Sequence, residues 1–113
     1  MEVTLYGRYV KFKINPENIN YIVEFGYKCE TYFQGGEEFP ISYSSLKNTL
    51  LKQFPRVFSY DFNLPVYVNT KNIAFCEDKH SGSITFTDGT KIKNLSGMDL
   101  RNMTMLMEED YTK

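Results

Sequence analysis

Few residues of this chain stand at a spacing that supports catalysis. A thiol nucleophile would need a base beside Cys29 or Cys76, and the one histidine, His80, follows Cys76 by four residues in an expected loop. That context provides no third group to orient the histidine as a base. His80 also has no companion at metal-ligand spacing, so no metal site is predicted.

Short glycine and serine motifs are better explained as turns than as catalytic loops. Gly35-Gly36 is not followed by the Lys-Ser or Lys-Thr pair of a phosphate-binding loop. Ser81-Gly82-Ser83 lacks the strand-turn-helix context of a nucleophile elbow. We therefore predict that the chain is not an enzyme and needs no cofactor.

Length and charge limit the classes of function. The 113 residues suffice for one domain with a modest core. Lysine and arginine number 13 against 14 acidic residues, a net charge of −1. Phosphate contacts dominate nucleic-acid affinity, so any DNA footprint must be a local basic patch. Part of the negative charge comes from an acidic C-terminal tail, residues 108–113.

The chain shows no membrane or export signal. No stretch approaches the apolar length of a membrane span, and the first residues lack the basic and apolar regions of a secretory signal. A cytoplasmic location is therefore expected. In that reducing compartment Cys29 and Cys76 are expected as free buried thiols, with a disulfide between them as the alternative.

Apolar alternation predicts a largely β framework. Strands are expected over residues 3–14, 19–25, 28–33, 38–43, 57–62, 66–69, 72–77, 83–87 and 90–95. Turns are expected at Gly35-Gly36, at residues 63–65 and at Asp88-Gly89. No internal repeat is apparent in the sequence.

Two segments change to helical spacing. Leu46, Leu50 and Phe54 recur every four residues and predict a helix over 44–54, which Pro55 ends. A capping pattern at residues 96–99 predicts a final helix. Its buried face is expected to hold the apolar residues Leu100, Met103, Leu106 and Met107.

From about residue 14 to 103, the order of these pieces resembles the LytTR-type DNA-binding domain of bacterial response regulators. The matching stretches are residues 18–24, 35–41, Ser45-Leu46, Phe54-Pro55, Val68-Asn69 with Ile73, and 87–92. The resemblance implies a mainly β (α+β) fold: a single elongated antiparallel sheet domain over residues 1–113, with one or two short helices. Such domains insert loops, rather than a recognition helix, into the major groove.

The resemblance places six residues at the DNA. They are Tyr27, Lys28, Asn63, Lys91, Lys93 and Asn94. The family's two basic loops are altered, because residues 61–65 stand where a run such as Arg-x-His-Arg-Ser is typical, and residues 94–97 stand where Ser-Arg-Arg is usual. Each lost arginine–guanine contact removes about 1–3 kcal/mol of discrimination.

Two functions follow as hypotheses. The first is a small transcriptional regulator that binds double-stranded DNA as a homodimer on paired half-sites, and we place it ahead because lysines still supply phosphate contacts. The second is a protein-binding derivative of the fold, such as a phage- or mobile-element-encoded inhibitor of a host regulator or of a nucleic-acid enzyme, a CRISPR effector included. Aromatic residues favour interfaces, so its anchors would be Tyr60, Phe62, Leu64 and Tyr67.

Overall fold

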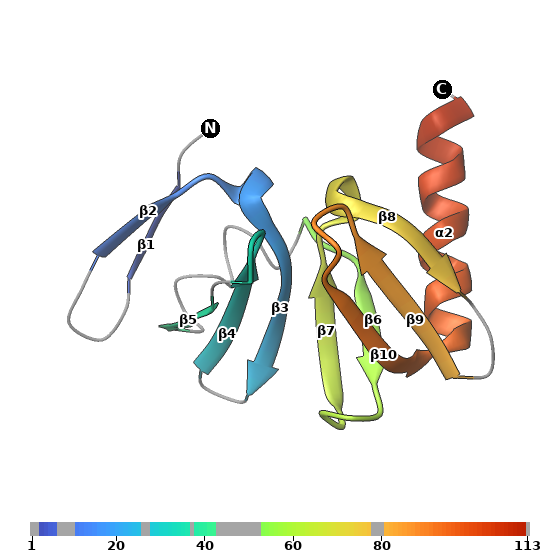
Figure 1. The fold of residues 1–113 in the computed structure, drawn as a ribbon, viewed down its shortest axis with the longest axis horizontal. Coiled ribbons are helices and arrows are strands. Elements are labelled where there is room, and N and C mark those ends of the chain that lie inside the picture. The colour runs from blue at the N-terminus through green and yellow to red at the C-terminus, as the bar shows by residue number, and fades with distance from the viewer. Residues whose placement is uncertain are drawn as a thin grey trace.

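The computed structural model describes residues 3–6, 11–25, 28–36, 38–42, 53–77 and 81–112, which form a mainly antiparallel β structure (Figure 1). One two-stranded sheet pairs β1 with β2. An eight-stranded sheet has the order β5-β4-β3-β7-β6-β10-β9-β8. The strands are β1 (Val3–Tyr6), β2 (Lys11–Ile14), β3 (Ile19–Phe25), β4 (Lys28–Phe33), β5 (Glu38–Ser42), β6 (Arg56–Ser59), β7 (Leu64–Val68), β8 (Ile73–Glu77), β9 (Ser81–Phe86) and β10 (Lys91–Ser96).

The described helices are two single 3₁₀ turns and one α-helix. They are η1 (Pro16–Asn18), η2 (Thr70–Asn72) and α2 (Gly97–Thr112). The predicted fold class is confirmed, as is the final helix. The helix expected over 44–54 lies outside the described residues, apart from Gln53 and Phe54, which form a turn and a bend.

The backbone is built from two equivalent halves, although no internal repeat was predicted from the sequence. Each half consists of a hairpin, a 3₁₀ turn and a three-stranded meander. The first half is β1–β2, η1 and β3–β5, and the second is β6–β7, η2 and β8–β10. The prediction that the chain has no internal repeat is therefore wrong for its backbone.

The two 3₁₀ turns show how closely the halves correspond. Asn15 and Asn69 begin them, and each side chain accepts a hydrogen bond from the backbone N–H two residues later, at 3.0 and 3.2 Å. The Asn18 carbonyl accepts from the Gln34 N–H and the Asn72 carbonyl from the Thr87 N–H, both at 2.8 Å, and each donor begins the turn after its meander's second strand. Ile19 and Ile73 follow, and the strand register shifts immediately after both.

One strand pair joins the two halves into a single sheet. β3 runs antiparallel to β7, with Tyr21 opposite Val68, Ile22 opposite Tyr67 and Val23 opposite Val66. A cluster of buried apolar side chains crosses this joint. It contains Tyr21, Val23, Val57, Val66, Val68, Ile84, Phe86, Ile92, Leu95, Leu100 and Met103.

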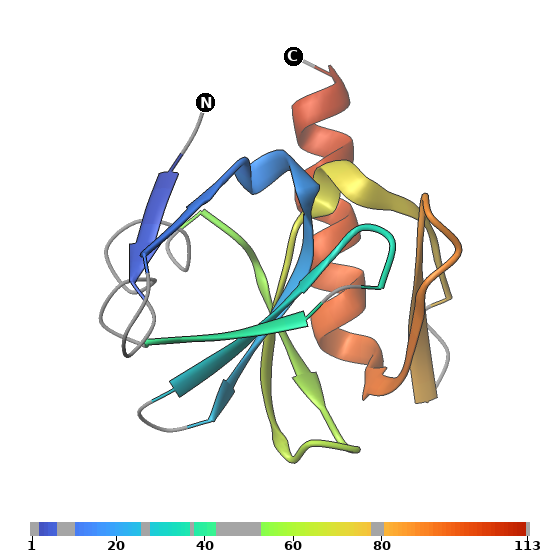
Figure 2. The ribbon, with the colours of Figure 1, turned by 60° about the vertical axis from the view of Figure 1, so that its left-hand side comes forward.

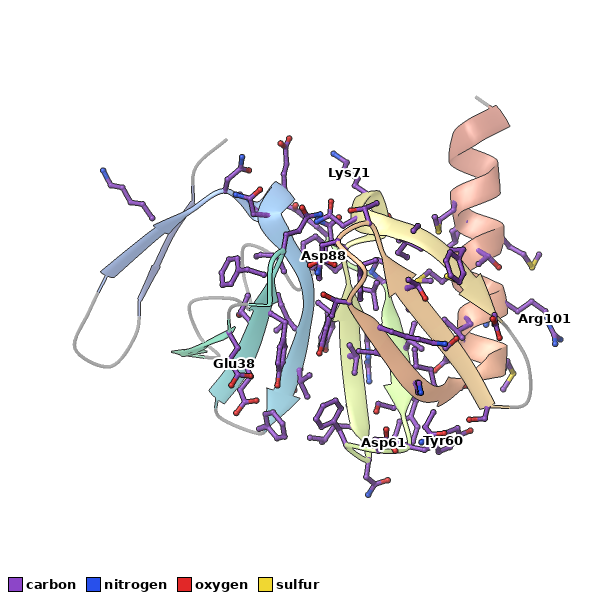
Figure 3. All side chains as sticks on the ribbon, viewed as in Figure 1. Glu38, Tyr60, Asp61, Lys71, Asp88 and Arg101 are labelled. Atoms are coloured by element: carbon purple, nitrogen blue, oxygen red, sulfur yellow. The ribbon has the colours of Figure 1, made fainter. Side chains whose placement is uncertain are left out.

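A polar clasp, formed by Asn20, Gly35, Asn69, Asn72 and Asp88, ties the halves at one end of the joint (Figure 3). Asp88 Oδ2 accepts from the Gly35 backbone N–H at 2.8 Å and from Asn20 Nδ2 at 3.2 Å. Asn69 and Asn72 both donate from Nδ2 to the Ile19 carbonyl, at 2.9 and 2.8 Å. Every one of these bonds connects a residue of one half with a residue of the other.

The second half is completed by α2, which packs on β6, β8, β9 and β10 (Figure 2). The helix is capped by Ser96, whose Oγ accepts from the Asp99 N–H at 3.2 Å. Asp99 in turn accepts from the Phe58 N–H at 2.9 Å and so ties the helix to β6. Gly82 lets Leu100 approach β9, because a Cβ at Gly82 would overlap the Leu100 side chain.

The predicted buried face of α2 is wrong at one residue, Leu106. Leu100 and Met103 are buried and Met107 is half-buried, but Leu106 is exposed. At 100° per residue, Leu106 lies about 60° around the helix from Met103 and outside the stripe that meets the sheet.

Several predicted strands have different bounds, and two of them differ most. Residues 3–14, expected as one strand, form the antiparallel pair β1–β2, which provides each strand with a hydrogen-bonded neighbour. The strand expected over 57–62 ends at Ser59, because the chain turns over Tyr60–Asn63 and the Ser59 Oγ accepts from the Phe62 N–H at 3.2 Å. The loop expected over residues 63–65 is therefore displaced, and Pro65 lies in β7 opposite Phe58.

The clasp predicts a specific loss of stability. Replacing Asp88 by Ala leaves the buried Asn20 amide without its acceptor, so we expect the free energy of unfolding to fall by about 1–3 kcal/mol in urea denaturation. Asp88→Asn is the control, because it keeps an oxygen acceptor without the charge. Equal stability of the wild type and both variants would contradict the role of the clasp.

The charge of Asp88 adds a pH dependence. Partial desolvation raises its pKa, but the hydrogen bonds from Gly35, Thr90 and Asn20 together outweigh it and hold the pKa below the ordinary 3.8. A lowered native pKa stabilises the fold above the unfolded value, and this contribution is lost as pH falls through the native pKa. The advantage of wild type over Asp88→Asn should therefore be present at neutral pH and disappear below about 3.8.

Candidate nucleic-acid interface

The end of the sheet opposite the clasp carries most of the predicted contact residues. β3 and β10 end there, β4 begins there, and the β6–β7 turn projects from it (Figure 1). Tyr60 and Asp61 lie at this end, far from Asp88 (Figure 3). We call the set Tyr60, Asp61, Phe62, Asn63, Ser81 and Asn94 the turn edge.

Two asparagines of the turn edge have left-handed backbone conformations. Asn63 has φ 54° where the β6–β7 turn enters β7, and Asn94 has φ 56° at an irregularity in β10 between Ile92 and Leu95. Asparagine adopts this conformation more readily than other residues with a Cβ. Both side chains are exposed. The backbone therefore presents two amide groups at one end of the sheet.

Asn94 is held by a three-residue hydrogen-bond network. Its Nδ2 donates to Asp61 Oδ1 at 2.7 Å, and its Oδ1 accepts from Ser81 Oγ at 2.7 Å. Its backbone carbonyl accepts from the Tyr60 N–H at 2.8 Å. Both ends of the Asn94 amide thus have partners within the protein, and an ionisable carboxylate lies at the surface beside it.

The predicted lysines lie along a neighbouring hollow. Lys91 and Lys93 are exposed on either side of the buried Ile92, as their alternation indicated. Both line a hollow of about 300 Å³. The other residues lining it are Tyr21, Ser59, Asp61, Phe62, Val66, Ile92 and Leu95. Lys93 and Asp61 therefore border the same depression, with opposite charges.

The remaining predicted DNA contacts are only partly placed. Lys28 is the first residue of β4 and lies opposite Phe25, so its backbone belongs to the end of the sheet that carries the turn edge. Tyr27 lies outside the described residues.

The four residues proposed as protein anchors do not share one surface. Tyr60 is 59% exposed and Phe62 is 37% exposed, both in the β6–β7 turn. Leu64 is half-buried and packs on the core cluster. Tyr67 is buried, and its hydroxyl donates to Glu24 at 2.9 Å. Of the four, Tyr60 and Phe62 are the pair that a partner can reach.

The two cysteines do not form the alternative disulfide. Cys29 is buried in β4, and Cys76, expected to be buried, is half-buried in β8. Burial and then the charge of Glu24 raise the pKa of Cys29 to about 12, so this thiol stays protonated. His80 lies outside the described residues, and within the described part no group of His, Cys, Asp and Glu could hold a metal. No described helix is long and apolar enough to cross a membrane.

Comparison with solved structures identifies the fold. The chain superposes on a LytTr DNA-binding domain from Bacillus cereus with a TM-score of 0.63, covering 94% of this chain and 95% of that one. The two sequences are 13% identical. No family model and no curated protein matches the sequence. The protein therefore has a LytTR-type fold, with a sequence far from that of its structural neighbour.

Two features of the site were missed by the sequence prediction. The pairing of Asp61 with Asn94 joins residues 33 positions apart, and no local pattern indicates it. Ser81 was considered only as part of a serine–glycine motif. The duplication did leave a signal, since Asn-x-x-Asn-Ile occurs at residues 15–19 and again at 69–73.

The backbone conformation of Asn94 can be tested separately from its side chain. Asn94→Gly removes both side-chain hydrogen bonds but adopts positive φ without strain, whereas Asn94→Ala adds about 1–2 kcal/mol of backbone strain. We expect the alanine variant to be the less stable of the two in urea denaturation. Equal stabilities would contradict a left-handed conformation at this position.

Proposed function

We propose that the protein binds double-stranded DNA through its turn edge and acts as a transcriptional regulator. The observation that carries the proposal is the pair of exposed left-handed asparagines, Asn63 and Asn94, at one end of a LytTR-type fold. An asparagine amide matches the N6 and N7 positions of adenine in the major groove. Turns that project from a sheet end suit such a contact, and the β6–β7 turn projects here, while α2 begins close by, directly after β10.

Lys91 and Lys93 supply the phosphate contacts in this proposal. Lys93 lies next to Asn94 and Lys91 two residues nearer the clasp, and together they form a local basic strip along the hollow on a chain whose net charge is −1. Phosphate contacts release counterions, so the affinity should depend strongly on salt.

Asp61 opposes this function in the free protein. Its carboxylate would repel phosphate, and it occupies the Asn94 amide that would otherwise contact a base. DNA binding therefore requires Asn94 to exchange the Asp61 oxygen for an acceptor on the DNA. The affinity is expected to be modest for this reason.

The DNA proposal predicts a change in salt dependence. Fluorescence anisotropy with random-sequence duplexes, titrated at low and moderate salt, should show binding that weakens as salt rises. Replacing both Lys91 and Lys93 by Ala should lower the slope of log affinity against log salt by about one unit per lost contact. An unchanged slope would remove both lysines from the footprint.

Two controls sharpen this test. Lys71→Ala changes an exposed lysine at the clasp end, far from the turn edge, and should leave the slope unchanged (Figure 3). Asp61→Asn removes the repelling charge, so binding should tighten a few-fold, a change of about 1 kcal/mol or less. Weaker binding by Asp61→Asn would show that the carboxylate assists the complex.

A second function is favoured by the exposed aromatic pair. Tyr60 packs edge-on against Phe58, with ring centroids 5.3 Å apart, and Phe62 against Phe25 at 6.0 Å, so both rings are supported yet accessible. Rigid aromatic residues beside a carboxylate suit a protein partner better than they suit phosphate. We infer a protein-binding role for the turn edge if DNA is not bound.

The protein-binding alternative has its own test. This test applies if wild type and Asp61→Asn both fail to bind DNA at low salt. The wild-type chain, immobilised, should then retain a protein partner, and a double variant carrying Tyr60→Ala and Phe62→Ala should fail to retain it. Truncating hot-spot residues typically costs 2 kcal/mol or more, about thirtyfold in affinity. Met105→Ala with Leu106→Ala, at exposed positions farther along α2, is the matched control. Equal loss in both variants would contradict a turn-edge partner site.

A further inference from the structure

The joint between the halves has no counterpart among the described strands; the β6–β10 pairing has none either, but its equivalents β1 and β5 already lie in contact. β3 and β7 form the joint between the halves, and the equivalents of these strands are β8 and β2. β8 is the last strand of the eight-stranded sheet, and β2 pairs only with β1 among the described strands. The two lie at opposite sides of the molecule, so they cannot pair within one copy (Figure 1).

The edge strand β8 exposes an aromatic side chain, Phe75, whose equivalent on β3 is buried. Ile19 corresponds to Ile73 and Asn15 to Asn69, both 54 positions apart, so Tyr21 corresponds to Phe75. Tyr21 is 6% exposed and lies opposite Val68, whereas Phe75 is 55% exposed. An exposed edge strand with an apolar side chain is a template for another strand.

We propose that β8 of one copy pairs antiparallel with β2 of a second copy, reproducing the β3–β7 joint between molecules. The equivalent register places Phe75 opposite Ile14 and Cys76 opposite Lys13. An aromatic residue opposite a β-branched one is a stabilising cross-strand pair.

This association is head-to-tail. Each copy offers one β8 and one β2, so the contact is heterologous and builds rings or open chains rather than a closed two-fold dimer. It uses neither the turn edge nor the lysine strip, and it is therefore independent of the proposed DNA binding.

The other exposed apolar surface does not carry the same inference. Met98, Met105 and Leu106 face solvent on α2, but no equivalent contact in the described part shows what would cover them. This helix face instead provides a control position, Met105, for the substitution that tests the β8 edge.

The register can be tested with one introduced cysteine. Lys13→Cys should form an intermolecular disulfide with the native Cys76, because directly opposed residues have Cβ atoms about 4.5–5.5 Å apart. Mild oxidation should give a ladder of covalent oligomers on a non-reducing gel. A chain with both Lys13→Cys and Cys76→Ser, mixed with wild type, should give covalent dimers and nothing larger.

The cross-link has a matched control. Lys91→Cys places a thiol at another exposed lysine and should form no linkage to Cys76. Equal cross-linking from positions 13 and 91, or none from position 13, would overturn the proposed register.

Self-association is measured separately by sedimentation over a concentration series. Phe75→Lys should weaken it about tenfold or more, because it removes the buried aromatic contact and places a charge on the edge. Met105→Lys is the matched control, since Met105 is 56% exposed, and it should have no effect. A monomer at every concentration, or loss of association in Met105→Lys alone, would overturn the proposal.

Discussion

The structure depends on the clasp between the halves more than on any other interaction. One carboxylate, Asp88, accepts from the Gly35 N–H in the β4–β5 turn of the first half, while two asparagines of the second half converge on the Ile19 carbonyl. These bonds fix where β3 lies against β7, and the core cluster follows from that joint. Because buried polar groups must find partners, the clasp specifies a single register for the two halves.

The clasp also determines where chemistry can occur. With one end of the sheet occupied by inter-half hydrogen bonds, the opposite end is left to carry the turn edge, and the exposed asparagine amides gather there. Asp61 and Asn94 are brought together by the pairing of β6 with β10, so the balance between DNA binding and protein binding rests on a contact made by the sheet. The same duplication that builds the joint leaves β8 and β2 as complementary edges on separate surfaces.

Most elements could be predicted because they rest on local signals. Alternation indicated β3 and β4, paired glycines and Asp88-Gly89 indicated the turns, and Ser96 indicated the start of α2. Predictions failed where packing overrides local pattern. Leu106 has helical spacing but lies outside the face of α2 that meets the sheet, and the β6–β7 turn is displaced because the Ser59 hydroxyl closes it earlier than Pro65 suggested.

The sequence by itself determined the fold class, the absence of a basic excess, and the candidate residues Asn63, Lys91, Lys93 and Asn94. Tertiary structure decided which of them act together. Asn94 meets Asp61 across 33 positions, Lys93 shares a hollow with Phe62, and Tyr67 is buried rather than accessible. The physical reason is that strand pairing sets distances between residues remote in the chain, and only the assembled sheet contains that information.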